Sequence, residues 1–495
     1  MISLTLENFR KLSRKGNLIP IFKEVDLDYD NPLSILKKIS NKEHCFLLES
    51  SAGPEKWAQY SFIGFDPKLI ITSHNNKIKI KPRNKNQQSI KGNIFLELKK
   101  IMKDFKPVNV PGLPRFYGGL VGFFSYEVIN QIEKIKNTPE KDISFPDSCF
   151  MLTDSVVIFD NINKSAKIVI NVHLKEEVDI KKVYNEALKQ ISMIEKLLKK
   201  SVKNPYGLKS ISKNSKPKIK SNYKQSNFLA AVRKVKKYVR EGDVIQTVIS
   251  QRWETEYQDN PINLYRSLRL LNPSPYMFFL KMKQNYIIGA SPEVLIRLEN
   301  NKVESRPIAG TRPRGETQIK DKYYEKDLLS DPKELAEHVM LVDLARNDIS
   351  KVCQSGTVKV SEMMAVERYS HVMHIVSHVE GKMKKNKDCF DLFKAAFPAG
   401  TLSGAPKIRA MEIIDELEPK ARGPYGGSVG YFGFSGNMDM SIVIRSFYLD
   451  KKKLYFQAGA GIVADSIPIK EFEETQNKSK AMLRAIEKNL GRDNQ

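Results

Sequence analysis

The runs Ser441-Ile442-Val443-Ile444-Arg445-Ser446-Phe447 and Leu454-Tyr455-Phe456-Gln457-Ala458 decide the expected fold. Both are short and rich in β-branched and aromatic residues, so each is predicted to be a strand. Residues 276–280 and 286–289 form a similar pair. Because such strands cluster instead of alternating strictly with helices, the chain is predicted to be α+β with large, mostly antiparallel sheets flanked by helices, not a doubly wound parallel fold.

The same reasoning places further elements along the chain. Glycine-punctuated residues 118–124 are expected to form a strand that another backbone approaches closely. Other apolar runs between turns predict strands at 45–48, 69–73, 150–159, 166–172 and 244–250. Helical spacing predicts helices at 333–348, 406–417 and 471–489.

One segment divides the chain. Residues 199–226 are rich in Lys, Ser, Asn and Pro and poor in large apolar side chains, which is typical of a linker. We therefore expect an N-terminal region at 1–198, a basic linker at 199–226 and a larger domain at 227–490. A chain of 495 residues is also long enough for two domains or one composite unit.

Composition restricts the possible classes of protein. The four cysteines are scattered without a C-x-x-C pair, which argues against a disulfide framework and for a reducing cytoplasm. No signal peptide and no membrane-spanning run are expected. The net charge of +25 comes from widely spread lysines without a nucleic-acid-binding motif, so we expect a basic surface and no nucleic-acid partner.

Two acidic helices carry the strongest chemical signal. Glu334 and Glu337 share one helical face, and so do Glu471 and Glu474. Two such faces brought together would make an all-oxygen site suited to Mg²⁺. From spacing alone, Glu334 could instead close a capping box on Asp331, and the second face could be an exposed salt-bridge stripe.

Several strings suit an anionic small molecule. Residues 306–315 combine a rigid turn with three arginines, and arginine suits carboxylates. Residues 397–407 form a glycine-rich loop before a helix, and further glycines lie at 423–430 and 459–461. His374 and His378 are four residues apart, which could suggest zinc on a helix, but the flanking alternation favours a strand.

Taken together, these strings resemble the chorismate-utilising enzymes, and most closely their anthranilate-forming members. The resemblance runs from about Phe46 to Lys480. The motifs that carry it are Leu47-Leu48-Glu49-Ser50, Asn272-Pro273-Ser274-Pro275-Tyr276-Met277, Gly289-Ala290-Ser291-Pro292-Glu293, residues 307–315, residues 334–348, residues 399–407 and residues 471–478.

The resemblance implies a site for Mg²⁺ and chorismate. The metal would be held by Glu337 and Glu474, supported by Glu334 and Glu471, and would contact the ring carboxylate. The resemblance further implies that the following residues bind the substrate: Gly310, Thr311, Tyr425, Arg445, Gly459, Ala460, Gly461 and Lys478.

The implied chemistry is addition of ammonia at C2 of the ring with loss of the C4 hydroxyl, followed by elimination of pyruvate. Glu293 matches the residue expected to act as the acid, His374 matches the residue linked to the elimination, and Thr401 completes the catalytic set. Water-activating relatives carry a lysine where this chain has Gln246, and aminodeoxychorismate-forming relatives carry one where it has Ala309. Both differences favour anthranilate as the product.

The resemblance also implies a partner and a regulator. Because no Gly-x-Cys-x-Gly nucleophile string occurs, the ammonia is expected from a separate glutamine amidotransferase subunit. Tryptophan is expected to inhibit by feedback, at a site partly within the N-terminal region. The residues expected there are Glu49, Ser50, Pro275, Tyr276, Met277, Val429 and Tyr431.

Overall fold

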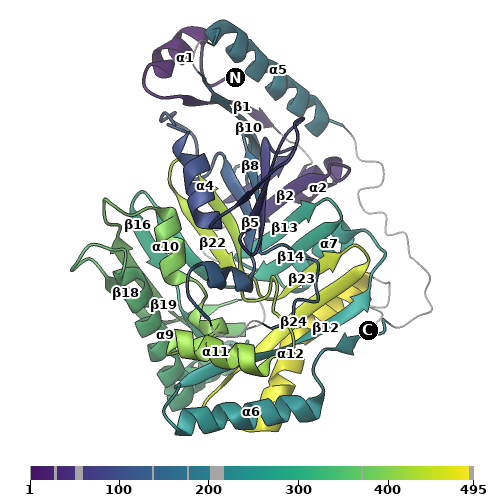
Figure 1. Ribbon diagram of the computed structural model, residues 1–495, viewed down its shortest axis with the longest axis vertical. Coiled ribbons are helices and arrows are strands. Elements are labelled where there is room, and N and C mark those ends of the chain that lie inside the picture. Colours follow the sequence, from purple (N-terminus) through teal and green to yellow (C-terminus); the bar gives the residue numbers. More distant parts are fainter. Residues whose placement is uncertain are drawn as a thin grey trace.

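The computed structural model describes residues 2–26, 30–50, 59–135, 139–175, 178–200, 217–369 and 372–489. Within these residues the strands form two sheets of twelve, and their ladders are antiparallel (Figure 1). The expected class, α+β with large antiparallel sheets, is confirmed.

The first sheet runs in the order β1 (Leu18–Asp26), β10 (Ser165–His173), β9 (Ser155–Asp160), β3 (Tyr60–Phe65), β2 (His44–Glu49), β13 (Tyr276–Met282), β14 (Asn285–Ser291), β23 (Ser446–Asp450), β24 (Lys453–Ile462), β12 (Gln246–Glu256) and β11 (Lys220–Ser221), with β20 (Gly404–Ala405) also pairing to β12. The second runs β17 (Ile308–Pro313), β19 (Val372–Lys382), β16 (Lys302–Ser305), β15 (Val294–Glu299), β22 (Met438–Ile442), β21 (Ser428–Gly433), β7 (Gly119–Phe124), β8 (Ser148–Thr153), β4 (Leu69–His74), β5 (Lys77–Pro82) and β6 (Gln88–Lys91), with β18 (Lys359–Arg368) also pairing to β19.

Helices surround the sheets. They are α1 (Leu6–Ser13), α2 (Pro32–Lys38), α4 (Ile94–Lys103), α5 (Ile180–Leu198), α6 (Gln225–Arg240), α7 (Pro261–Leu271), α8 (Gln318–Ser330), α9 (Pro332–Ser350), α10 (Cys389–Ala396), α11 (Lys407–Leu417) and α12 (Pro468–Asn489), with 3-10 turns at η1 (Tyr126–Gln131) and η2 (Gly400–Leu402). Among the described helices, none is both long enough and apolar enough to cross a bilayer.

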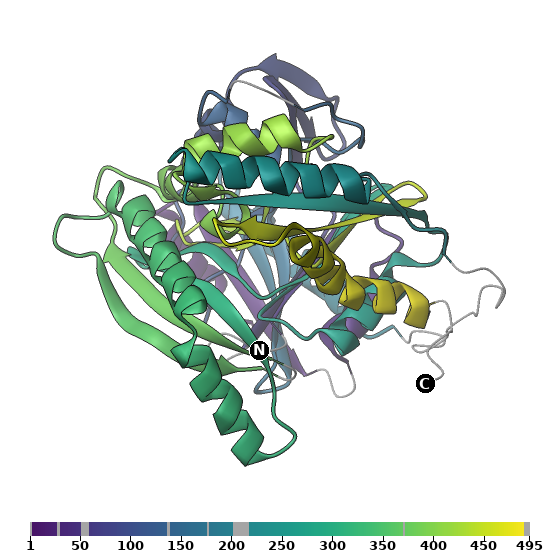
Figure 2. The ribbon, with the colours of Figure 1, turned by 90° about the horizontal axis from the view of Figure 1, so that it is seen from below.

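The two sheets face each other across an aromatic core. The ring of Phe62 in the first sheet lies 6.0 Å from that of Tyr431 in the second. Because successive strand residues point to opposite faces, Phe432 faces outward, where it stacks on Phe390 of α10 at 4.5 Å. On the far side of the first sheet, Figure 2 shows α6 and α11 lying beside each other. The side chains of α6, α11 and α12 share a hydrophobic cluster there with β12 and β24.

The chain passes between the sheets at four short crossings: β3 to β4, β8 to β9, β14 to β15, and β22 to β23. At two of these crossings the structure differs from the strands predicted from the sequence. Residues 150–159 and 441–447 were each expected to be one strand, and each is two strands in different sheets. The second break falls at Arg445, whose φ of 49° is incompatible with a continuing strand.

Residues on both sides of the expected linker build both sheets. The N-terminal β2 pairs with β13, and the N-terminal β7 pairs with β21. Residues 201–216 lie outside the described residues, and α6 already begins at Gln225. The division at 199–226 stays a prediction, and the shared sheets show a composite unit in which the two regions are interleaved.

Candidate active site

The two acidic helices are α9 and α12. In α9, Asp331 caps the N-terminus by accepting hydrogen bonds from the backbone amides of Lys333 and Glu334. The pKa of Glu337 is raised, first by burial and then by the negative charge of Glu334 in its own helix and of Glu474 in α12. Glu474 of α12 therefore lies within electrostatic reach of Glu337 of α9.

The individual carboxylates have different surroundings. The Glu334 carboxylate accepts a hydrogen bond from Arg312 at 3.2 Å, so its side chain binds an arginine instead of closing a capping box. In α12, Glu471 is buried, and burial raises its pKa. Glu474 is half exposed and pairs with Lys478 at 2.7 Å. The carboxylate face of α12 is therefore only partly an exposed salt-bridge stripe, because Glu474 is paired near the surface and Glu471 is buried.

This donor set has the chemistry that Mg²⁺ requires. All four groups are carboxylates, and two of them carry a raised pKa because burial and neighbouring negative charge disfavour ionisation. A divalent cation would relieve both effects. The four residues fit the ion by the chemistry of their side chains, and the expected division into ligands, Glu337 and Glu474, and supporting residues, Glu334 and Glu471, stays a prediction.

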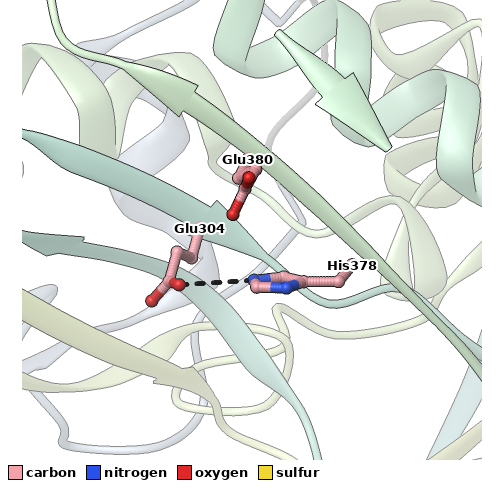
Figure 3. Close-up of side chains that lie close together, drawn as sticks. All are labelled: Glu304, His378 and Glu380. Carbon is pink, nitrogen blue, oxygen red and sulfur yellow. Dashed lines mark ion pairs between the residues drawn. The ribbon is translucent and has the colours of Figure 1, made fainter. Parts of the chain in front are cut away.

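A tighter group of possible ligands lies elsewhere, in Glu304, His378 and Glu380 (Figure 3). Their ligand atoms lie within 4.8 Å of one another, but the Lys302 ammonium sits 2.8 Å from Glu304 and 2.6 Å from Glu380. The lysine supplies the positive charge, so these residues form an ion-pair network. Because His374 and His378 both lie on strand β19, the helical zinc arrangement is excluded.

Two glycines of β24 leave room for neighbouring side chains of the candidate active site. A Cβ on Gly459 would lie 2.9 Å from the Tyr425 hydroxyl, and one on Gly461 would lie 2.5 Å from Nε2 of Gln246. The Gly459 carbonyl accepts a hydrogen bond from Lys478 at 3.2 Å. Tyr425, Lys478 and the ribbon Gly459 to Gly461 therefore lie together, and their role in binding substrate stays a prediction.

Glu293 and Arg445 lie at two neighbouring crossings between the sheets. The crossings are joined because the backbone amide of Ile442 donates to the Glu293 carbonyl at 3.1 Å and that of Ala290 donates to the Arg445 carbonyl at 3.2 Å. Burial raises the pKa of Glu293 to about 8, against the opposing effects of Thr401, Arg445 and Lys478. A carboxyl with that pKa is mostly protonated at neutral pH and can donate a proton.

The Arg445 side chain is held ready for an anion. Within the described residues it makes no hydrogen bond or ion pair, and burial lowers its pKa while the charge of Glu293 opposes this. A partly buried arginine without a partner for its charge favours an anionic ligand.

His374 is oriented by its neighbours. Its Nδ1 lies 2.8 Å from the Gly310 carbonyl and 3.1 Å from the Thr311 hydroxyl. Because a carbonyl only accepts, Nδ1 carries the proton and Nε2 is left with a lone pair. Burial lowers the histidine pKa to about 4, so the ring is neutral at pH 7 and Nε2 can accept a proton.

The residues expected to form a regulatory site line a pocket between the sheets. All seven are among its lining residues: Glu49, Ser50, Pro275, Tyr276, Met277, Val429 and Tyr431. Its aromatic walls and polar groups suit an amphipathic ligand with a flat ring.

The pocket's charged groups have partners within the protein. The buried Glu49 carboxylate is bound by Arg269 at 2.8 and 2.9 Å and by the Tyr265 hydroxyl at 2.8 Å. Sequence reasoning missed Arg115 and Asp439, which line the pocket and lie 3.5 Å apart. Each stands alone among unlike neighbours in the sequence, so no local pattern could have identified it.

Known proteins give a consistent comparison. A family model described as chorismate binding enzyme matches residues 43–484. Anthranilate synthase component 1 of Acetivibrio thermocellus is 47% identical over 486 residues, covering 98% of this chain and 98% of the relative. The protein of that name from Aquifex aeolicus is 46% identical over 488 residues, with the same coverage.

Two solved structures share the fold of this chain. The crystal structure of anthranilate synthase component I from Streptococcus pneumoniae superposes with a TM-score of 0.78 at 36% identity, covering 86% of this chain and 92% of that one. The menaquinone-specific isochorismate synthase of Escherichia coli has a TM-score of 0.69 at 18% identity, covering 97% and 98%. The latter comparison shows a shared fold alone.

Proposed function

The chain belongs to the chorismate binding enzymes, and from this premise we propose that it is the large subunit of an anthranilate synthase, converting chorismate and ammonia to anthranilate and pyruvate in tryptophan biosynthesis. The observation that carries the proposal is the unpaired Arg445 beside a Glu293 whose pKa is raised to about 8. A dicarboxylate substrate supplies the anion that the arginine lacks, and the protonated carboxyl supplies the acid.

The first step is amination. Ammonia forms a bond to C2 of the ring, the ring double bonds shift, and the C4–O bond breaks. Hydroxide is a poor leaving group, so Glu293 gives its proton to the departing oxygen, which leaves as water. Arg445 and Tyr425 hold the enolpyruvyl carboxylate, and Thr401 fixes the Glu293 carboxyl by donating to Oε1 at 3.1 Å.

The second step is elimination. His374 removes the C2 proton through Nε2, the electrons of that C–H bond form the third double bond of the now aromatic ring, and the bond from the ring to the enolpyruvyl oxygen breaks. Enolpyruvate leaves, takes up a proton and becomes pyruvate. The Gly310 carbonyl supports this role because it keeps the proton of the neutral imidazole on Nδ1.

Mg²⁺ would be held by Glu337 and Glu474 with support from Glu334 and Glu471, and it would bind the ring carboxylate and draw negative charge toward it. Lys478 connects the carboxylates of α12 to strand β24, because it contacts both Glu474 and the Gly459 carbonyl. It adds positive charge on the substrate side.

Two positions favour ammonia addition followed by aromatisation. Gln246 is buried with its amide 3.4 Å from Glu337, and an amide cannot activate water as a lysine amine can. Ala309 presents only a methyl group where aminodeoxychorismate-forming relatives carry a lysine. Both residues distinguish this chain from isochorismate- and aminodeoxychorismate-forming enzymes.

Ammonia would come from a glutamine amidotransferase subunit. All four cysteines of the chain are buried, and burial raises the thiol pKa in each case. A buried thiol with a raised pKa is a poor nucleophile, so none of the four suits glutamine hydrolysis.

Tryptophan would inhibit by feedback from the pocket between the sheets. Its walls include Tyr276 and Tyr431, which suit an indole ring. Two short paths join this pocket to the active site. Val429 and Tyr431 lie on β21, which begins shortly after Tyr425 in the chain. Tyr276 pairs in register with Ser291, two residues before Glu293.

The proposed function is tested with purified protein, chorismate, Mg²⁺ and an ammonium salt. Anthranilate should appear by fluorescence and by mass, with pyruvate in equal amount. A non-aromatic amino product or isochorismate as the sole product would contradict the proposal. Adding a chelator tests the metal, and adding tryptophan tests the feedback.

A further inference from the structure

A fully buried ion pair, Arg422 with Glu418, lies directly behind the candidate active site. Arg422 heads the largest side chains that are almost wholly enclosed, and Glu418 is 5% exposed. The guanidinium donates from Nε to Glu418 Oε2 at 2.9 Å and from Nη2 to Oε1 at 2.6 Å. This two-point contact fixes the plane of the guanidinium.

The remaining hydrogen bonds of the Arg422 side chain reach two segments of the candidate active site. Nη1 donates to the Leu402 carbonyl at 2.6 Å, and Leu402 directly follows Thr401. Nη2 donates to the Val248 carbonyl at 2.9 Å, and Val248 pairs in register with Gly461. One side chain therefore ties the loop of Thr401 to the strand behind the glycine ribbon.

Glu418 makes complementary contacts on the same strand. Its Oε1 accepts from the Ser250 backbone amide at 2.8 Å and from the Ser250 hydroxyl at 2.7 Å. Ser250 pairs in register with Gly459. The Ser250 hydroxyl also accepts a hydrogen bond from Gln457 on β24 at 2.8 Å. The carboxylate therefore holds both strands beneath the pocket.

The arginine also contacts the aromatic residue of the pocket. Its guanidinium carbon lies 5.7 Å from the ring centroid of Tyr425 and 4.6 Å from that of Tyr126. The Tyr425 hydroxyl reaches the space that a Cβ on Gly459 would fill. A shift of the guanidinium would therefore displace a group that faces the substrate.

A buried ion pair gives little net stability compared with two well-packed apolar side chains, because both charges lose their hydration. What this pair provides is fixed geometry, since its hydrogen bonds end on two separate segments, the loop of Thr401 and strand β12, and the guanidinium also contacts the Tyr425 ring. We propose that Arg422 and Glu418 are positioning residues that hold Thr401, Tyr425 and the ribbon Gly459 to Gly461 in the arrangement that binds substrate. The kinetic side of this inference rests on the proposed function.

The test compares Arg422→Lys with Arg409→Lys. Arg409 lies on α11, pairs with Asp243 and Glu412 at 2.6 and 3.1 Å, and is partly exposed, so its substitution is a matched control. Lysine keeps the charge of Arg422 but cannot donate hydrogen bonds to Glu418, Leu402 and Val248 at the same time. Folding is checked by circular dichroism and thermal melting. Amide hydrogen exchange is then measured in residues 399–404 and 424–428, together with kcat and the KM for chorismate.

For Arg422→Lys we expect faster amide exchange in both segments, because hydrogen bonds from a charged donor are lost. We also expect KM for chorismate to rise, or kcat/KM to fall, by at least about tenfold. Arg409→Lys should match the parent protein. A folded Arg422→Lys protein with unchanged exchange and unchanged KM and kcat would overturn the inference.

If Arg422→Lys does not fold, Ser250→Ala takes its place, because it removes only the hydroxyl bonds to Glu418 and Gln457. Faster exchange in residues 399–404 with a raised KM supports the inference, and parental values for both overturn it. Hydrogen exchange needs no substrate. It therefore tests the pair even where the parent protein forms no anthranilate, which would contradict only the proposed function.

Discussion

Replacing Thr401 by valine should move the high-pH limb of the activity profile to higher pH. Thr401 donates a hydrogen bond to Glu293 Oε1, and this contact favours the ionised carboxylate. Valine keeps the β-branched shape and removes the donor. Without the donor the charged form is less stable, so the pKa of Glu293 rises above its present value of about 8.

The size of the shift follows from the contact. A hydrogen bond to a charged group contributes about 1.5–3 kcal/mol, and one pKa unit corresponds to about 1.4 kcal/mol, which gives a shift of about 1–2 units. The 3.1 Å separation is long for a hydroxyl donor, so the lower end, about one unit, is expected. Arg445 and Lys478 also lower the pKa of Glu293, and the substitution leaves both in place, so the shift reports the loss of the Thr401 donor.

The sign depends on which form of Glu293 is active. An acid must be protonated, so activity is present below its pKa and is lost as pH rises through about 8 in the parent protein. At the other end, His374 must be neutral to act as a base, so activity is lost as pH falls through about 4. The assay follows kcat/KM for chorismate against pH, with the concentration of un-ionised ammonia held constant.

Ser403→Ala is the matched control. The Ser403 hydroxyl lies on the same loop, but it donates to the Ala399 carbonyl at 2.8 Å and not to Glu293. It should leave the midpoint of the high-pH limb in place, whatever its effect on rate. An unmoved or lowered midpoint in Thr401→Val, or a parent protein without a falling limb at high pH, would refute the assignment of Glu293 as the acid.

Three further outcomes are expected. Changing Glu337 or Glu474 to glutamine should remove most activity at limiting Mg²⁺ with little change in melting temperature, and full activity of Glu474→Gln there would refute the metal assignment. His374→Met should slow elimination more than amination, so that mass spectrometry detects an aminated, non-aromatic intermediate; slower chorismate consumption without it would disprove this role. Saturating chorismate should weaken tryptophan binding by at least about fivefold in calorimetry, and equal affinities with and without chorismate would exclude coupling.

Much of the site could be read from the sequence because its residues sit in continuous strings. The acidic spacing of α9 and α12 already specifies one face on each helix, and tertiary packing only has to bring the two faces together. Glu49 shows the limit of such reading. Its string predicted the pocket, but the position of its carboxylate depends on Arg269 and Tyr265 of α7, which local sequence does not reveal.

Arg422 was missed for a related reason. It lies immediately before the glycine string that begins at Gly423, and an isolated arginine there has no periodic signal. Its importance comes from contacts with Leu402 and Val248, which lie 20 and 174 residues away along the chain. Such a residue is found only when the fold shows that three distant segments meet.

The missed crossings explain why the central pair of the site was hardest to place. Alternation along a strand assigns each side chain to one face, but Glu293 and Arg445 lie where the chain leaves one sheet for the other. The three residues before Arg445 are apolar, and the one polar neighbour after it, Ser446, is buried, so no turn signal marks the break. Since each crossing hydrogen-bonds to a residue flanking the other, the acid and the arginine are positioned by the same backbone contacts. Local pattern fails at this place because function requires an irregular backbone that a continuous strand cannot supply.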